Sequence, residues 1–256
     1  MVVLLASCEV IREDDRLIEL PQPIAGEQAH VLVDYTGFRC VNCPKAAEMA
    51  EELQGLYGER LIVVSMHPAS NPFTQGKYDY TCPAADTYYQ LMGGTASTPF
   101  PAGNIDFTQH DNTYFADYLQ WPTMMSEAMQ QDSRTSITAQ AQLREKEIIV
   151  RTEVSAEQEK QCKVVVWLME DSIVGMQAMP DGTANSEYIH MHMLRTTGKE
   201  VWGKDCKVSY VPTACEDTIS LPDGCVAKNC HVVSILMDAE SKEIYNATQV
   251  TIQNPL

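Results

Sequence analysis

A C-x-x-C motif that stands between an apolar run and a helical pattern restricts the fold of this chain most. Residues 30–35 form a short apolar run rich in β-branched side chains, which predicts a buried strand. Cys40 and Cys43 follow a turn, and apolar residues then recur at helical spacing as far as Gly58. A second apolar run at 60–66 predicts another buried strand. A strand, a helix and a strand in this order predict a βαβ unit with a parallel sheet.

The position of the two cysteines at the start of the predicted helix points to thiol chemistry. Cys40 would face unpaired backbone N–H groups at the positive end of the helix dipole, and Arg39 adds a cation beside it. Both effects stabilise a thiolate, so Cys40 is the predicted nucleophile and Cys43 is the predicted resolving thiol. A C-x-x-C motif in a βαβ context is typical of thioredoxin-like redox sites.

The run that leads into Cys40 resembles the thioredoxins, which carry an apolar strand, an acidic residue and an aromatic residue before their first cysteine. Asp34 lies six residues before Cys40. The resemblance implies that this carboxyl is buried and that it accepts or relays the proton of Cys43. The chain departs from thioredoxins at Arg39, where they have Trp, and at residues 41–42, which are Val-Asn in place of Gly-Pro.

The same resemblance implies a cis-proline that faces the cysteines and orients the backbone of a substrate. Pro99 and Pro101 are both candidates, and we favour Pro101 because a strand-like run follows it. Residues 67–97 interrupt the pattern before these prolines and carry Cys82 and several tyrosines. This insertion is either a lid or binding wall beside the motif, or an ordinary surface insertion.

The second half of the chain changes to short stretches of alternating apolar and polar residues, separated by turns. About seven short strands of this kind predict an antiparallel sandwich of immunoglobulin-like type. We therefore expect an α/β thioredoxin-like domain at 28–133, with an insertion at about 67–97, followed by an all-β immunoglobulin-like sandwich domain at 134–256. Residues 1–27 are the expected signal remnant and tether.

Nine cysteines are many for a cytosolic protein and indicate an oxidising compartment. The sequence allows Cys162 to pair with Cys230, Cys206 with Cys215, and Cys225 with either Cys82 or Cys230. A zinc site made of these cysteines is disfavoured, because their spacing does not provide paired C-x-x-C ligands.

His190 and His192 stand two residues apart on a predicted strand, where their side chains would share one face. They are either ligands of a metal such as copper or two partly exposed polar residues. No third ligand is recognisable from the sequence, so we predict no metal and no cofactor.

The amino-terminal residues predict attachment to a membrane through lipid. The letters L-A-S-C at residues 5–8 resemble the bacterial lipobox, in which the cysteine, here Cys8, is lipidated. An acidic segment and two prolines follow, as in an exposed tether or a surface-export signal. No apolar run approaches the roughly 20 residues of a membrane-spanning helix. The chain has 35 Asp plus Glu against 18 Lys plus Arg, and its net charge of −17 disfavours nucleic acid as a partner.

Three segments together resemble the 28-kilodalton outer-membrane-protein family of Gram-negative anaerobes. They are T-G-x-x-C-x-x-C-P at 36–44, F-P-A-G-N-I-D at 100–106 and Y-I-H-M-H-M-L-R at 188–195. The resemblance runs from about His30 to the carboxyl terminus, and it departs at Phe107, where an arginine is expected. It implies an outer-membrane lipoprotein that faces the periplasm or the cell surface, in a family with suspected adhesins.

Two functions remain open for such a chain. The favoured one is a binding, adhesion or accessory role for an envelope lipoprotein with an unknown surface partner, in which the Cys40–Cys43 pair is a structural disulfide or takes part in exchange. The alternative is an active thiol–disulfide oxidoreductase or isomerase that acts on protein thiols and disulfides. A third option is copper handling by the cysteine pair and the His-Met strand. Whether the protein is an enzyme stays open.

Overall fold

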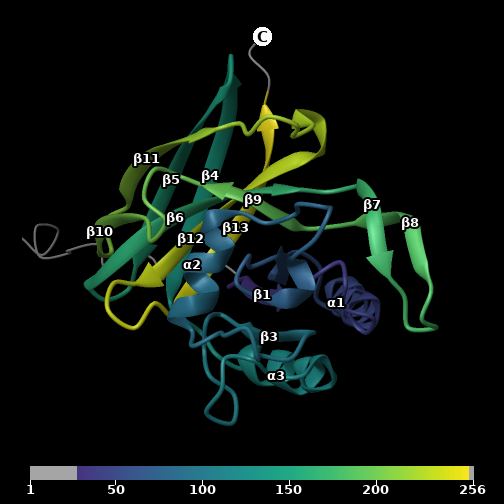
Figure 1. Ribbon diagram of the computed structural model, residues 1–256. Helices are drawn as coiled ribbons and strands as arrows, with labels where there is room; N and C mark the ends of the chain where they lie inside the picture. Colours follow the sequence, from purple (N-terminus) through teal and green to yellow (C-terminus); the bar gives the residue numbers. More distant parts are fainter. Residues whose placement is uncertain (1–27, 254–256) are drawn as a thin grey trace, which may run out of the picture.

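The computed structural model describes residues 28–253, so Cys8 and the tether expected at 1–27 lie outside the described residues. The α-helices of the described chain, α1 (Cys43–Tyr57), α2 (Pro83–Leu91) and α3 (Trp121–Ala128), lie in the lower half of Figure 1. Short 3-10 helices are found at η2 (Gly58–Arg60), η3 (Pro72–Thr74), η4 (Tyr118–Gln120) and η5 (Ala227–Asn229). No helix within residues 28–253 is both long enough and apolar enough to cross a membrane.

Strands make up most of the regular structure. In the first half they are β1 (His30–Tyr35), β2 (Leu61–Met66) and β3 (Ala102–Ile105). In the second half they are β4 (Thr135–Arg144), β5 (Glu147–Ala156), β6 (Lys160–Glu170), β7 (Ile173–Ala178), β8 (Ala184–His190), β9 (Met193–Thr197), β10 (Lys204–Val208), β11 (Thr213–Ser220), β12 (Cys230–Asp238) and β13 (Ile244–Gln253).

The strand–helix–strand unit predicted around the cysteines is present. β1 and β2 are parallel and in register from His30 opposite Leu61 to Tyr35 opposite Met66. Pro44 stands in the first turn of α1, where its fixed φ suits a helix start. Gly58, with a φ of 59°, ends the helix in a conformation that side-chain-bearing residues disfavour.

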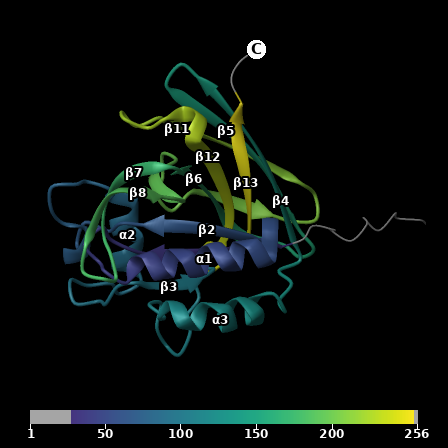
Figure 2. The ribbon, with the colours of Figure 1, turned by 90° about the vertical axis from the view of Figure 1, so that its right-hand side faces the viewer.

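The predicted fold class, a thioredoxin-like α/β domain followed by a separate immunoglobulin-like sandwich, is wrong. One 11-stranded sheet runs through both halves of the described chain in the order β11-β5-β4-β13-β12-β6-β9-β2-β1-β3, with β10 on β6. The halves join where Ser65 of β2 pairs in parallel with Met193 of β9. The Ser65 N–H also donates to the His192 carbonyl over 2.7 Å. Figure 2 shows β2 lying directly below the strands of the second half.

A shared apolar cluster explains why the two halves do not form separate units. Val33 and Tyr35 of β1 belong to the same buried cluster as Trp167 of β6 and Val233 of β12. Each half therefore covers an apolar sheet face of the other, and exposing either face to water would cost free energy in proportion to its area.

Aromatic residues from both halves meet at the centre of this shared core. The Trp167 Nε1–H donates to the Tyr88 hydroxyl over 2.8 Å. The Phe107 ring lies 5.6 Å from that of Tyr88 and 5.9 Å from that of Trp167, measured between centroids. Phe107, where the family resemblance suggested an arginine, is thus an apolar filler of the junction. Tyr88 belongs to α2, so part of the segment at 67–97 is core rather than surface insertion.

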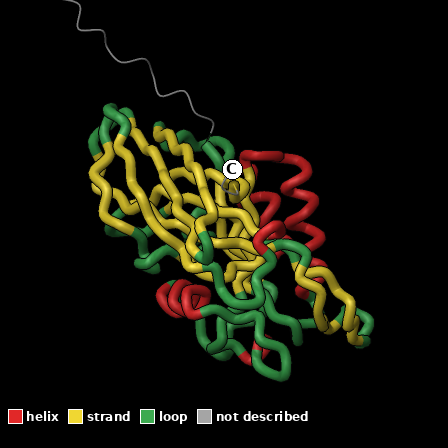
Figure 3. Tube along the Cα trace, turned by 90° about the horizontal axis from the view of Figure 1, so that it is seen from above, coloured by secondary structure: helices red, strands yellow, loops and turns green. Residues whose placement is uncertain are grey.

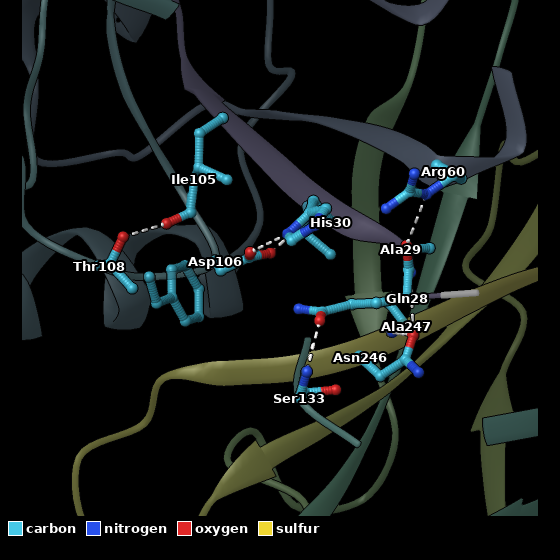
Figure 4. A network of polar contacts seen from close by, with 12 residues as sticks. Gln28, Ala29, His30, Arg60, Ile105, Asp106, Thr108, Ser133, Asn246 and Ala247 are labelled. Atoms are coloured by element: carbon cyan, nitrogen blue, oxygen red, sulfur yellow. Dashed lines mark hydrogen bonds and ion pairs between the residues drawn. The ribbon is translucent and has the colours of Figure 1, made fainter. Parts of the chain in front are cut away.

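A buried polar network connects the two halves at the start of β1, beside His30 (Figure 4). The Asp106 Oδ2 lies 2.6 Å from the His30 Nδ1. The Asp106 carbonyl accepts from the Ile244 N–H over 2.9 Å. The Asn246 Oδ1 accepts from the Ala29 N–H over 3.0 Å. These bonds link the residues just before β1 and just after β3 to β13, and the one from Ala29 spans 217 residues of sequence. A cavity of about 580 Å³ opens beside the network.

The remaining cysteines include two pairs of neighbours. The sulfurs of Cys206 and Cys215 lie 3.2 Å apart. Cys225 and Cys230 belong to one cluster in which the ligand atoms lie within 4.8 Å of one another. Cys82 has a different role, because it caps α2 and its sulfur accepts from the Ala85 N–H.

We expect the oxidised protein to contain Cys206–Cys215 and Cys225–Cys230 disulfides, each stabilising the fold by about 2 kcal/mol through a short closed loop. Peptide mapping by mass spectrometry under non-reducing conditions, after alkylation, measures this pairing. A Cys162–Cys230 or Cys82–Cys225 bond in the mapped peptides would contradict it.

Candidate functional site

The candidate site is the Cys40–Cys43 disulfide at the start of α1. The Cα atoms of the two cysteines are 5.4 Å apart, and α1 begins at Cys43, so Cys40 lies in the turn before the helix. Each cysteine is only 2% exposed. The turn is closed by the Cys40 N–H, which donates to the Gly37 carbonyl over 3.0 Å.

Asp34 lies on β1 and is nearly inaccessible to solvent. Its Oδ1 has no hydrogen-bond partner among the described residues. Burial raises the pKa of this carboxyl from 3.8 to about 8, because ionisation in an apolar surrounding is unfavourable. Asp34 and Cys43 both line a small cavity of about 120 Å³. The structure thus brings together a disulfide and a carboxyl that holds its proton at neutral pH.

The other polar groups of this cavity include two histidines. His67 and His190 both line it, and their ring centroids are 6.1 Å apart. Burial lowers the pKa of His67 to about 3 and that of His190 to about 4, so both rings are neutral at pH 7. The cavity is therefore polar but carries no fixed positive charge from these rings.

Pro101 is found at the same end of the sheet as the cysteines. The Phe100–Pro101 peptide bond is cis. Pro101 directly precedes Ala102, which pairs with Tyr35 at the end of β1. The role assigned to Pro101 in orienting a substrate stays a prediction.

A hairpin from the second half covers the disulfide. β7 and β8 form a separate two-stranded sheet that lies beside the start of α1 in Figures 1 and 2. In Figure 3 this hairpin is the pair of strands that extends away from the main group. The Gln177 Nε2–H donates to the Cys40 carbonyl over 2.9 Å, and the Ala178 N–H donates to the Phe38 carbonyl over 2.8 Å.

Sequence reasoning missed this hairpin and Gln177. The one available signal is Gly175 in β7, because a glycine inside a strand often marks the close approach of another group. A Cβ at this position would lie 1.8 Å from the Tyr80 hydroxyl, which also accepts from the Met176 N–H over 3.1 Å. Tyr80 comes from the segment at 67–97, which therefore contacts the hairpin.

His190 and His192 do not lie on one regular strand as predicted, although both line the cavity beside Cys43. β8 ends at His190, and His192 has a φ of 56°, so the alternation of side chains stops between them. His190 packs against Tyr80, with ring centroids 4.7 Å apart. The His192 Nδ1 instead lies 3.4 Å from the Asp171 Oδ1.

Comparison with known proteins gives both a family and a fold. The family described as outer membrane protein Omp28 matches residues 85–255. A search of curated proteins by sequence gave no match. The solved structure of HBP35 of Porphyromonas gingivalis is similar over 89% of this chain and 76% of its own, with a TM-score of 0.69 and 15% identity. That likeness shows fold alone, and it extends through both halves as one arrangement.

Two further solved structures are similar at lower scores. A protein from Agrobacterium tumefaciens matches 88% of this chain and 96% of its own, with a TM-score of 0.49 and 16% identity. A domain of the outer membrane lipoprotein Omp28 from Porphyromonas gingivalis matches 48% of this chain and 90% of its own, with a TM-score of 0.35 and 21% identity.

Proposed function

Because the chain belongs to the Omp28 family of outer membrane proteins, we propose that it binds a partner protein in the cell envelope and exchanges disulfides with it at Cys40–Cys43. The family match confirms the resemblance to the 28-kilodalton outer-membrane-protein family. A lipid anchor at Cys8 and an orientation toward the periplasm or the cell surface complete the proposal.

The buried carboxyl of Asp34, whose Oδ1 has no hydrogen-bond partner among the described residues, is the observation that carries this proposal. A buried carboxyl oxygen without a hydrogen bond lowers the stability of a fold, and a permanent structural disulfide does not require it. A resolving cysteine does need a proton donor when its bond to the other sulfur breaks. Asp34 lines the same cavity as Cys43 and holds a proton, because its pKa is about 8.

The exchange starts when a thiolate of the partner attacks the Cys40 sulfur. The partner–Cys40 bond forms, the Cys40–Cys43 bond breaks, and Cys43 leaves as a thiolate that takes the proton of Asp34. A second partner thiolate then attacks the partner sulfur of this mixed disulfide and releases Cys40. The partner has gained a disulfide, and its two electrons now reside on the reduced Cys40 and Cys43.

Access to the sulfurs depends on the β7–β8 hairpin. Both cysteines are buried, and the Gln177 side chain is bonded to the Cys40 carbonyl. Val174 and Ile189 on the two strands of this hairpin are 63% and 54% exposed. These apolar side chains are where a partner would dock and displace the hairpin. The same observations favour a second function, binding of a partner with the disulfide left permanent.

We expect Cys43→Ser to trap a mixed disulfide at Cys40, because the resolving sulfur is gone. The variant is incubated with oxidised glutathione, and the adduct is located by mass spectrometry. In the matched control, Cys40→Ser, the remaining Cys43 should react at least about tenfold more slowly, because Arg39 adjoins Cys40 and stabilises its thiolate.

The reduction potential of the wild-type pair decides between the two functions. A value between roughly −120 and −270 mV is expected for an exchange site. A value below about −300 mV, or reduction only on unfolding, would contradict exchange and leave the binding function.

A further inference from the structure

We propose that Asp171, His192 and His231 form a binding site for a divalent transition-metal ion of the zinc type, and that the bound ion clamps the β7–β8 hairpin. One ligand atom from each of the three residues lies within 4.8 Å of the other two. The site is separate from the Cys40–Cys43 pair, and ion binding does not depend on the exchange proposed above.

The distances between these atoms suit a shared ion. The Asp171 Oδ1 lies 3.4 Å from the His192 Nδ1, and the Asp171 Oδ2 lies 3.5 Å from the His231 Nδ1. Ligands of a tetrahedral zinc ion lie about 2.0–2.2 Å from the metal and therefore about 3.3–3.6 Å from one another. These two separations, one from each oxygen of Asp171, fall in this interval, and the third is within 4.8 Å.

A simple ion pair explains the arrangement less well. The His192 Nδ1 is buried and has no hydrogen-bond partner among the described residues, although a carboxylate oxygen is 3.4 Å away. An imidazole that only neutralised Asp171 would turn its N–H toward that oxygen, at about 2.7–2.9 Å. Ligand atoms that face a common centre instead stay farther apart and unaligned.

The fold holds the three residues in place from three separate segments. Asp171 directly follows β6, and its N–H donates to the Asn229 carbonyl over 3.0 Å. The His192 N–H donates to the Asp171 Oδ1 over 2.7 Å. His231 is fixed within β12, opposite Met169 of β6. Such backbone bonds set the positions of the ligands before any ion binds, as hydrogen bonds around the ligands do in metal proteins.

The donor set selects the class of ion. Two imidazoles and one carboxylate suit zinc and its neighbours among the divalent transition metals, whereas calcium and magnesium prefer oxygen donors alone. Three protein ligands leave a coordination position open for water or for a donor from a partner. His192 also lines the cavity that Cys43 lines, whereas Asp171 and His231 do not.

A neighbouring cluster, Glu170 with Cys225 and Cys230, is the weaker candidate. The Glu170 carboxylate is already engaged, because it lies 3.3 Å from the Arg195 Nε and accepts from the Val226 N–H over 2.7 Å. A disulfide between the two cysteines would remove both thiolates as ligands.

Two of the ligands flank the β7–β8 hairpin in the sequence, so a bound ion would hold the two ends of the hairpin together. Asp171 stands two residues before β7, and His192 stands two residues after β8. An ion bound to both would join the two ends of the hairpin and fasten them to His231 of the main sheet. The hairpin would then be held over Cys40, to which Gln177 is bonded.

Zinc titration of the full chain, freed of metal by chelation and kept oxidised, tests the site by calorimetry. We expect one zinc ion per chain, with binding weakened at least about tenfold in His192→Ala and in His231→Ala. His190→Ala, which removes a nearby imidazole outside the site, should bind zinc as the wild type does. A Cys225→Ser, Cys230→Ser double variant should also bind normally.

Cobalt substitution provides a second measurement that does not depend on variants that fold poorly. A Co²⁺ spectrum without thiolate charge-transfer bands is expected for two nitrogens and one carboxylate. The absence of zinc binding, wild-type binding in both histidine variants, or a thiolate spectrum would overturn the site.

The clamp is tested by the rate at which a small thiol reagent reduces Cys40–Cys43. Zinc should slow this reduction at least about threefold in the wild type and leave it unchanged in His192→Ala, since local opening limits access. An unchanged rate in a protein that binds zinc would overturn the clamp. A reduction potential below about −300 mV would instead contradict the proposed exchange, and it would not affect the proposal of the metal site.

Discussion

Replacing Trp167 with alanine is expected to lower the free energy of unfolding by about 3–5 kcal/mol, as for other large buried aromatics. Trp167 is fully buried and packs within the cluster that both halves of the chain share. Because this core is common, the loss should affect the whole molecule. Chemical denaturation followed by near-ultraviolet circular dichroism and by far-ultraviolet circular dichroism should give one coincident transition at lower denaturant.

Two control variants separate the causes of this effect. Trp167→Phe keeps most of the apolar volume and loses the bond to the Tyr88 hydroxyl, so it should cost less than Trp167→Ala. Leu119→Ala, at a position that is 67% exposed, should change the stability by less than about 0.5 kcal/mol. Two separate transitions, of which only that of the second half moved, would contradict a common core.

Replacing Asp34 with asparagine is expected to make the protein more stable above pH 6 and to remove much of its dependence on pH between 4 and 8. The pKa of Asp34 is about 8 in the native state, against 3.8 for an unperturbed carboxyl. Between these values the native protein keeps a proton that the unfolded chain has released. Stability therefore falls as the pH rises through this interval, and the full destabilisation is present above pH 8.

The size of the expected gain in stability follows from the difference between the pKa of Asp34 in the native protein and that of an unperturbed carboxyl. Each unit corresponds to about 1.4 kcal/mol, so Asp34→Asn should gain on the order of 2–5 kcal/mol at pH 8 and little at pH 4. Urea unfolding at pH 5 and pH 8 measures the difference. Glu52→Gln, an exposed change on α1, is the control that should leave the slope as it is. Parallel stability curves for wild type and Asp34→Asn would show that the native carboxyl is ionised.

The same variant separates stability from chemistry. A side-chain amide in place of the carboxyl cannot give a proton to the Cys43 thiolate, so Asp34→Asn should slow the opening of the disulfide by a partner thiol while it stabilises the fold. A variant that became more stable and reacted at the wild-type rate would remove Asp34 from the proposed exchange.

Local patterns were enough to find the cysteine site. The apolar run of β1, the helical spacing of α1 and the apolar run of β2 are properties of neighbouring residues, and the structure has all three at the expected places. The choice of Pro101 over Pro99 rested on the strand that follows, and the bond before Pro101 is cis. Short-range hydrophobic preferences determine the strands and the helix, so neighbouring residues were enough to predict them. The cis-proline was expected from the resemblance to thioredoxins.

Contacts between segments that are distant in the sequence could not be predicted from such local patterns. β2 and β9 pair through one residue pair, Ser65 with Met193. The residue pattern of neither strand predicts which strand lies beside it. The sequence predicted that the strands are apolar and therefore buried, but this pattern does not predict which segment packs against them. The separate sandwich was therefore the wrong expectation, although most of its strands exist.

The histidines show the same limit at the scale of a site. The alternation of side chains along a strand predicted that His190 and His192 point to the same side. β8 ends at His190, and His192 lies beside Asp171 and His231 instead. The sequence by itself determined the family, the motif around Cys40 and Cys43, and the elements on either side. Only the tertiary structure decided the apolar cluster that both halves share, the hairpin over the disulfide and the grouping of Asp171 with two histidines. The reason is that burial and side-chain proximity depend on the free energy of the whole chain, which pairs residues far apart in sequence.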